Sequence, residues 1–125
     1  MNSIESFKDL HAWQAAYGLV LKIYKLTKTF PREELFGLSS QMRRSAVSVT
    51  SNIAEGFGRK SWKEKLYFYR IARGSLIELH NQLIIAQGVG HASQENIQDI
   101  ELDIERVHKL VNGLISSCGT KLANK

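Results

Sequence analysis

The chain has 125 residues, and its 17 lysines and arginines against 12 acidic residues give a net charge of +5. This length suits one domain with a single core, and no apolar run reaches the ~20 residues of a membrane-spanning helix. The amino terminus lacks the order of a signal peptide, and the single cysteine excludes an internal disulfide, so we expect a cytoplasmic protein that does not span a membrane.

The first predicted helix covers residues 6 to 29 and ends before Pro31, because the residue before a proline is disfavoured in helical geometry. Two apolar stripes run along it in steps of three and four residues. They are Leu10, Trp13, Tyr17, Val20 and Tyr24, and beside them Ala16, Leu19, Ile23, Leu26 and Phe30. Together these stripes form an unusually wide apolar arc.

The second predicted helix lies within residues 36 to 59 and ends at Gly56 and Gly58, where glycine can adopt the left-handed cap conformation. Its apolar stripe consists of Leu38, Met42, Ala46, Val49, Ile53 and Phe57. The opposite side carries small hydroxyl side chains bounded by charges, namely Arg44, Ser48, Ser51 and Glu55. This second face is either packed against a neighbouring helix or exposed to solvent, and the sequence leaves both readings open.

The third predicted helix opens at Ser61, which forms a capping-box pattern with Glu64. Its core stripe is Phe68, Ala72, Leu76, Leu79, Leu83 and Ala86, whereas another side carries Leu66, Ile77 and Ile84. Gly88 and Gly90 end this helix. It therefore presents two apolar faces.

The fourth predicted helix is capped by Ser93 and has the most regular apolar period in the chain. Its stripe is Ile97, Ile100, Ile104, Val107, Val111, Leu114 and Cys118. The position of Cys118 on this stripe favours core packing over a reactive role. We expect the domain to span residues 1 to 118 and residues 119 to 125 to be a frayed tail.

Four amphipathic helices joined by short turns predict an all-α fold, an antiparallel up-and-down four-helix bundle. A coiled assembly of longer hairpins is the alternative. The extra apolar stripes exceed what one bundle interior buries, and a monomer rarely leaves such stripes exposed. We therefore expect a homo-oligomer.

Positive charge is concentrated between residues 43 and 73, where eight basic residues face two acids and the local balance is +6. A basic region around the turn between the second and third helices is typical of phosphate binding. The predicted nucleic-acid-binding residues are Arg43, Arg44, Arg59, Lys60, Lys63, Arg70 and Arg73. Trp62, Tyr67 and Tyr69 lie among these charges and provide rings for base stacking.

A structural reading of the same residues stays open. The aromatic residues then belong to the core or an interface, and the charges keep the protein in solution. Ion pairs would also withdraw cations from a phosphate site: Glu55 is a possible partner of Arg70 or Arg73, and Glu78 of Arg43.

No catalytic or metal-binding constellation is present. The four histidines are scattered without paired ligand spacing, and no phosphate-binding loop or dinucleotide fingerprint occurs. We expect no enzyme activity, no metal and no cofactor. Asn52, Glu55 and Glu78 are interpreted as structural or interface positions.

Three stretches carry a family resemblance: GLSSQMRR at residues 37–44, SNIAEGFGR at 51–59 and ARGSLIEL at 72–79. Through them residues 7–111 resemble the four-helix-bundle proteins encoded within intervening sequences of bacterial 23S ribosomal RNA genes, also described as S23-like. The resemblance implies an antiparallel bundle that assembles into a ring, with a homopentamer as the expected form. The matched polar positions are Arg43, Arg44, Asn52, Glu55, Arg59, Arg73 and Glu78, to which the resemblance assigns no chemistry.

The family in turn resembles the accessory variability determinant of diversity-generating retroelements, a basic pentameric bundle that binds nucleic acid and a reverse transcriptase. The chain departs from many relatives at Thr50, where they carry a proline that would kink the helix. The threonine predicts a straighter second helix.

Two functional hypotheses follow. The first is a non-enzymatic, oligomeric nucleic-acid-binding protein that contacts phosphates, with RNA favoured over DNA because of the gene context that the resemblance implies. The second is a protein-interaction scaffold, for example an accessory subunit of a retroelement reverse transcriptase, which uses the small-residue face or the end of the barrel.

Overall fold

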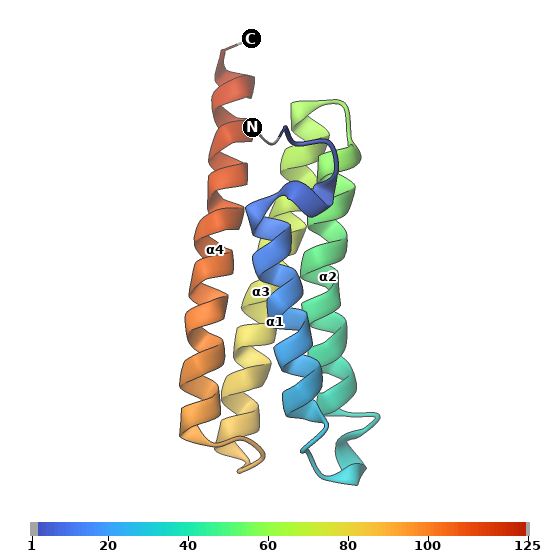
Figure 1. Ribbon diagram of the computed structural model, residues 1–125, viewed down its shortest axis with the longest axis vertical. Coiled ribbons are helices and arrows are strands. Elements are labelled where there is room, and N and C mark those ends of the chain that lie inside the picture. The colour runs from blue at the N-terminus through green and yellow to red at the C-terminus, as the bar shows by residue number, and fades with distance from the viewer. Residues whose placement is uncertain (1–2, 125) are drawn as a thin grey trace.

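The computed structural model describes residues 3–124, and all regular elements within them are helical (Figure 1). In chain order they are the short 3-10 turn η1 (Phe7–Asp9), α1 (His11–Thr27), a second 3-10 turn η2 (Arg32–Glu34), α2 (Leu38–Gly58), α3 (Trp62–Gly88) and α4 (Gln94–Ala123). Each long helix runs antiparallel to the next, and α1 packs against both α2 and α4. The predicted up-and-down four-helix bundle is confirmed.

The predicted apolar stripes form the core of the bundle. Side chains that are almost fully buried come from every long helix and include Leu19, Ile23, Met42, Val49, Ile53, Leu76, Leu79, Leu83, Val107 and Val111. Cys118 is buried as well, and this burial raises the pKa of its thiol, as core packing requires.

Serine side chains cap the amino-terminal ends of two helices, as the sequence predicts. The Ser61 hydroxyl accepts a hydrogen bond from the backbone N–H of Glu64 at 3.0 Å and donates to the Glu64 carboxylate at 3.1 Å. The Ser93 hydroxyl accepts from the N–H of Asn96 at 3.1 Å. Each contact satisfies a backbone donor that a helix start otherwise leaves unpaired, so the turns before α3 and α4 are short.

Helix α2 ends at Gly58 as predicted, but neither Gly56 nor Gly58 adopts the left-handed conformation. Within residues 3–124 that conformation occurs only at Gly90, with φ of +84°. Instead, the Nζ atom of Lys65 donates to the carbonyl oxygens of Phe57 at 2.7 Å and Gly56 at 3.3 Å. A lysine therefore satisfies the last carbonyls of α2 and complements the negative end of its dipole.

Helix α4 continues to Ala123, beyond residue 118, the predicted end of the domain, and fraying of residues 119–125 stays a prediction. The helix has no proline in this stretch, and the Nζ atom of Lys121 lies 5.6 Å from the centroid of the Trp62 ring at the start of α3. This cation–π contact joins the end of α4 to the start of α3. Lys125 lies outside the described residues.

Helix α2 is continuous through Thr50, whose hydroxyl donates to the carbonyl oxygen of Val47 at 2.7 Å. Such a bond is a common arrangement for threonine inside a helix. None of the described helices combines the length and the apolar character that crossing a membrane requires.

The lower end of the bundle in Figure 1 is held by a contact that we call the Glu34–His91 clasp. Oε2 of Glu34, in the connector between α1 and α2, lies 2.8 Å from Nε2 of His91, in the turn between α3 and α4. The other carboxylate oxygen of Glu34 accepts from the N–H of Leu38 at 3.3 Å. The clasp thus joins both connections and caps the start of α2.

We expect Glu34→Gln to lower the thermal stability at pH 7. The hydrogen bond from His91, and secondly that from the Leu38 N–H, lower the pKa of Glu34 below its usual 4.5. The stabilisation is therefore fully present above pH 4.5 and is lost as the pH falls through the pKa of the folded state. Thermal denaturation at pH 7 and pH 3 should show a gap between variant and wild type that narrows in acid. Glu33→Gln serves as the matched control, and a gap independent of pH would contradict the expectation.

Candidate nucleic-acid interface

The seven predicted binding residues do not form one cluster. Arg43 and Arg44 lie in the first half of α2, whereas Lys60 follows its end. At 1.5 Å per helical residue, Arg44 and Lys60 are about 20 Å apart along the bundle. The charge concentration seen in the sequence is therefore spread along two helices and the turn between them.

The side chain of Arg43 is held by contacts with other residues of the chain. Its Nε atom donates to the hydroxyl of Thr27 at 2.8 Å, and its guanidinium carbon lies 4.8 Å from the centroid of the Tyr24 ring. Thr27 is buried and donates in turn to the carbonyl oxygen of Ile23 at 2.8 Å. Arg43 therefore connects α2 to α1 instead of reaching freely into solvent.

Arg59 and Arg73 are also engaged. Arg59 pairs with Glu55 at 3.1 Å and lies over the Phe68 ring, 4.7 Å from its centroid. Arg73, which is partly buried, donates to Oδ1 of Asn112 on α4 at 3.0 Å. The possible pairs of Glu55 with Arg70 or Arg73 are not formed. Glu55 pairs instead with Arg59, which lies one helical turn further along the chain.

The other predicted polar positions make local contacts. Glu78 accepts a hydrogen bond from Gln82 at 3.3 Å, so the expected pair of Glu78 with Arg43 is also wrong. Asn52 donates to the backbone oxygen and the hydroxyl of Ser48 at 2.9 and 3.1 Å. These residues stabilise α2 and α3 themselves.

Part of the small-residue face of α2 is packed against α3. The hydroxyl oxygens of Ser48 and Ser75 are 2.8 Å apart across the two helices. Serine side chains allow this close approach, whereas Ser51 on the same face stays exposed. Ser48 thus serves helix packing within the chain, whereas Arg44, Ser51 and Glu55 on the same face are exposed.

Four predicted cations are exposed and have no side-chain hydrogen bond or ion pair with any described residue: Arg44, Lys60, Lys63 and Arg70. Lys60 lies in the turn between α2 and α3, and Trp62 and Lys63 lie in the first turn of α3, at the upper end of the bundle (Figure 1). Lys121 lies at the same turn through its contact with the Trp62 ring. We call Lys60, Lys63 and Lys121 the turn cluster.

The sequence interpretation missed Lys121 because it assigned this residue to a frayed tail. The regular apolar period of α4 up to Cys118 was the available signal, since a helix without a proline or strong cap tends to continue. Only the return of α4 to the end of the bundle shows that Lys121 joins cations about sixty residues earlier in the chain.

Tyr69 and Tyr67, two of the three aromatic residues near the turn cluster, differ in access. Tyr69 is only 4% exposed, and burial raises the pKa of its hydroxyl to about 12. Its ring packs over Gly56 and is closed to a base. Tyr67 is 62% exposed and meets Phe68 edge to face, which leaves its face available for stacking.

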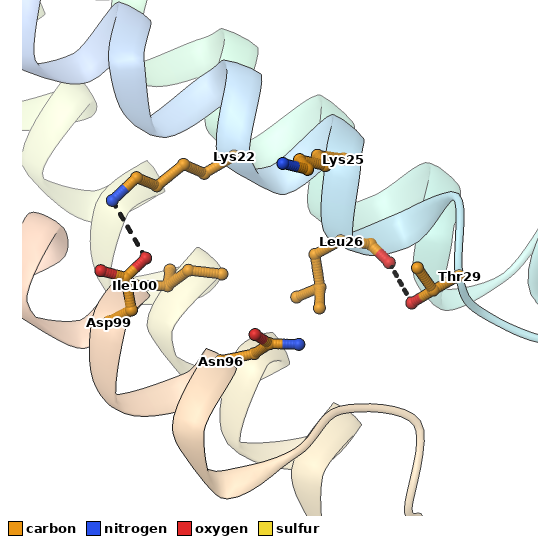
Figure 2. A pocket seen from close by; sticks show the side chains of 7 residues that line it. All are labelled: Lys22, Lys25, Leu26, Thr29, Asn96, Asp99 and Ile100. Atoms are coloured by element: carbon orange, nitrogen blue, oxygen red, sulfur yellow. Dashed lines mark hydrogen bonds and ion pairs between the residues drawn. The ribbon is translucent and has the colours of Figure 1, made fainter.

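A separate pocket of about 280 Å³ lies between α1 and α4 (Figure 2). Nζ of Lys22 lies 2.6 Å from Asp103 and 3.0 Å from Asp99, and these two bonds raise the pKa of the Lys22 ammonium. Lys25, Asn96 and the apolar Leu26 also line the pocket. Because Lys22 on α1 pairs with Asp99 and Asp103 on α4, the pocket is a salt-bridged junction of two helices.

Two of the four histidines, His80 and His91, pair with single carboxylates. Besides the clasp, Nε2 of His80 lies 2.7 Å from Glu101. Within residues 3–124 no three side chains of histidine, cysteine, aspartate or glutamate are grouped so that they could hold a metal ion.

Comparison with known proteins places these features in context. A family model described as 23S rRNA-intervening sequence protein matches residues 8–113. The fold is similar to a crystal structure from Bacteroides thetaiotaomicron of a protein with unknown function from the S23 ribosomal protein family, with a TM-score of 0.80. The identity is 24%, over 87% of this chain and 98% of that chain, so this likeness shows the fold alone. A comparison with curated proteins found no match.

Proposed function

The chain belongs to the 23S rRNA-intervening sequence protein family, and on this premise we propose that it is a non-enzymatic, oligomeric protein that binds nucleic acid. The observation that carries the proposal is the turn cluster. Its lysines are exposed, and Lys60 and Lys63 are not neutralised by any described acidic residue. Such cations, next to the exposed ring of Tyr67, match the chemistry of a phosphate backbone and its bases.

Phosphate contacts would dominate the affinity, and sequence preference would be modest, because lysine reads charge and not base edges. RNA is favoured over DNA by the gene context that the family description carries. Arg59 and Arg73 keep structural roles in this proposal, and Arg70 extends the cationic surface down α3 from the turn cluster.

We expect Lys60→Ala with Lys63→Ala to weaken RNA binding and to flatten its salt dependence. Each lost phosphate contact reduces the slope of log affinity against log salt by about 1, so the pair should reduce it by about 2. The measurement is fluorescence anisotropy of a labelled RNA across a salt series. Lys25→Ala with Lys28→Ala removes the same charge at the other end of the bundle and is the matched control. Equal slopes for both double variants would refute the turn cluster as the site.

We also propose that the protein binds copies of itself, with a pentamer as the expected form. Ile77 and Ile84 on α3 are 58% and 52% exposed, and Tyr17 and Leu21 on α1 are 47% and 52% exposed. Exposed apolar stripes of this kind are typical of protein interfaces. Because α1 and α3 are diagonal in the bundle, a contact between them would be head to tail, and such contacts form a ring when the rotation between neighbours closes.

The second candidate function is a protein-interaction scaffold, such as an accessory subunit of a retroelement reverse transcriptase. Leu102 favours it, because this side chain is 67% exposed on α4 and stands apart from the stripes on α1 and α3. Copurification with nuclease treatment separates the two functions. A defined protein partner that survives nuclease supports the scaffold, and loss of all partners supports nucleic-acid binding.

A further inference from the structure

A groove of about 750 Å³ on the α1–α2 face lies apart from the turn cluster. Aromatic and aliphatic side chains, serines and two arginines line it: Tyr24, Leu35, Phe36, Ser40, Arg43, Arg44, Val47, Ser48 and Ser51. The only charged residues in this lining are the arginines, so the groove is positively charged.

Phe36 is 93% exposed, and a network of bonds holds the connector that carries it. The backbone N–H of Gly37 donates to the carbonyl oxygen of Glu34 at 2.9 Å, and that of Leu35 donates to Arg32 at 3.1 Å. The Glu34–His91 clasp fixes the same segment to the other end loop. The Phe36 ring is therefore presented to solvent by a fixed backbone, which lowers the entropy lost when a ligand stacks on it.

The two arginines offer donors to an anion. The bond from Arg43 to Thr27 uses Nε, so the four N–H groups of its two terminal nitrogens remain for a ligand. Stacking on Tyr24 holds this guanidinium at the wall of the groove. Arg44 is exposed and makes no ion pair within residues 3–124. A planar guanidinium forms paired hydrogen bonds with phosphate oxygens.

We propose that this groove binds single-stranded RNA, with an unpaired base stacked on Phe36 and the neighbouring phosphates bound by Arg43 and Arg44. The inference rests on the proposed nucleic-acid function and adds the place where a base is contacted. A base inside a duplex is already stacked and paired and cannot lie on the Phe36 ring. The hydroxyls of Ser40 and Ser51 offer further partners to the sugar and phosphate oxygens.

The charge of the groove favours RNA over a second copy of the chain. An apolar partner helix would cover Arg44 without a carboxylate to pair with it, and covering an unpaired charge is costly. A phosphate backbone supplies the missing negative charge at regular spacing. The exposed stripes on α1 and α3 remain available for assembly.

The test compares a fluorescein-labelled 12-nucleotide RNA with the duplex of the same sequence, by anisotropy with the full-length protein. We expect Phe36→Ala to weaken single-strand binding by about 5- to 100-fold, the value of one stacked base, and duplex binding by less than about 2-fold. Leu102→Ala truncates another exposed apolar side chain, 67% exposed on α4, and should change neither. Arg44→Ala should reduce the salt slope of single-strand binding by about 0.7.

Three outcomes overturn the inference. In the first, Phe36→Ala leaves single-strand binding unchanged or weakens both RNAs equally. In the second, it lowers the mass of the assembly in light scattering with RNA affinity unchanged, which assigns the groove to a second copy. In the third, the wild type binds neither RNA, and the proposed function then fails as well. Binding that depends on Lys60 and Lys63 but not on Phe36 refutes the groove alone. Circular dichroism confirms that each variant is folded.

Discussion

Replacing Gly56 with alanine is expected to destabilise the bundle by about 1–3 kcal/mol, the usual cost of overpacking a core. A Cβ atom at this position would lie 2.6 Å from Cε1 and 2.8 Å from Cδ1 of Tyr69. Tyr69 is only 4% exposed, so its ring has no free space to move into. Alanine gains up to about 1 kcal/mol in helix propensity over glycine, which is too little to offset the clash. Thermal and urea denaturation measure the loss.

The matched control is Gly113→Ala on α4. A Cβ atom at Gly113 meets nothing within 4 Å, and the residue is exposed inside a long helix. This substitution should therefore stabilise the protein by about 0.5–1 kcal/mol, opposite in sign to Gly56→Ala. If both variants were stabilised, the contact between Gly56 and Tyr69 would not be a tight packing constraint.

Ile77→Glu combined with Ile84→Glu is expected to break the proposed assembly into monomers near 14.2 kDa. Both side chains are more than half exposed in the single chain, so glutamates there leave the bundle core intact. In an assembled ring the same positions would be covered, and two unpaired carboxylates in an apolar contact cost several kcal/mol for each interface. Light scattering at micromolar concentration should show a mass several times larger for the wild type.

Leu102→Glu is the control, because it places a carboxylate at an equally exposed leucine on α4. It should leave the mass unchanged. A wild type that is already a monomer would refute the assembly itself, whereas a double variant that stays assembled would show that another face of the bundle forms the contact.

The helices and the core were predictable from the sequence because their signals are local. Apolar residues spaced three and four positions apart place Leu76, Leu79 and Leu83 on one side of α3, whatever packs against them. The serine caps at Ser61 and Ser93 act within one turn of their own helix. Such signals need no knowledge of the tertiary structure.

The contacts of the charged residues were not predictable in this way. Whether Arg43 reaches Thr27, or Arg73 reaches Asn112, depends on the rotation of two helices about their axes, which residue spacing in one helix does not define. The sequence indicates no role for Lys65, but it lies where α2 ends and satisfies its carbonyls. The exposure of Phe36 could not be predicted from helical periodicity. It results from the connector between α1 and α2, which the Glu34–His91 clasp holds in place.

The up-and-down order of the helices also bears on how the chain folds. Every packed pair of long helices except α1 with α4 consists of neighbours in the sequence, so most native contacts close short loops at little entropic cost. Only the contact between α1 and α4 joins helices that are far apart in the sequence, and the salt bridges of Lys22 with Asp99 and Asp103 belong to this contact. Low contact order of this kind belongs to proteins that fold within microseconds to milliseconds, which shortens the time for which their apolar surfaces are open to aggregation.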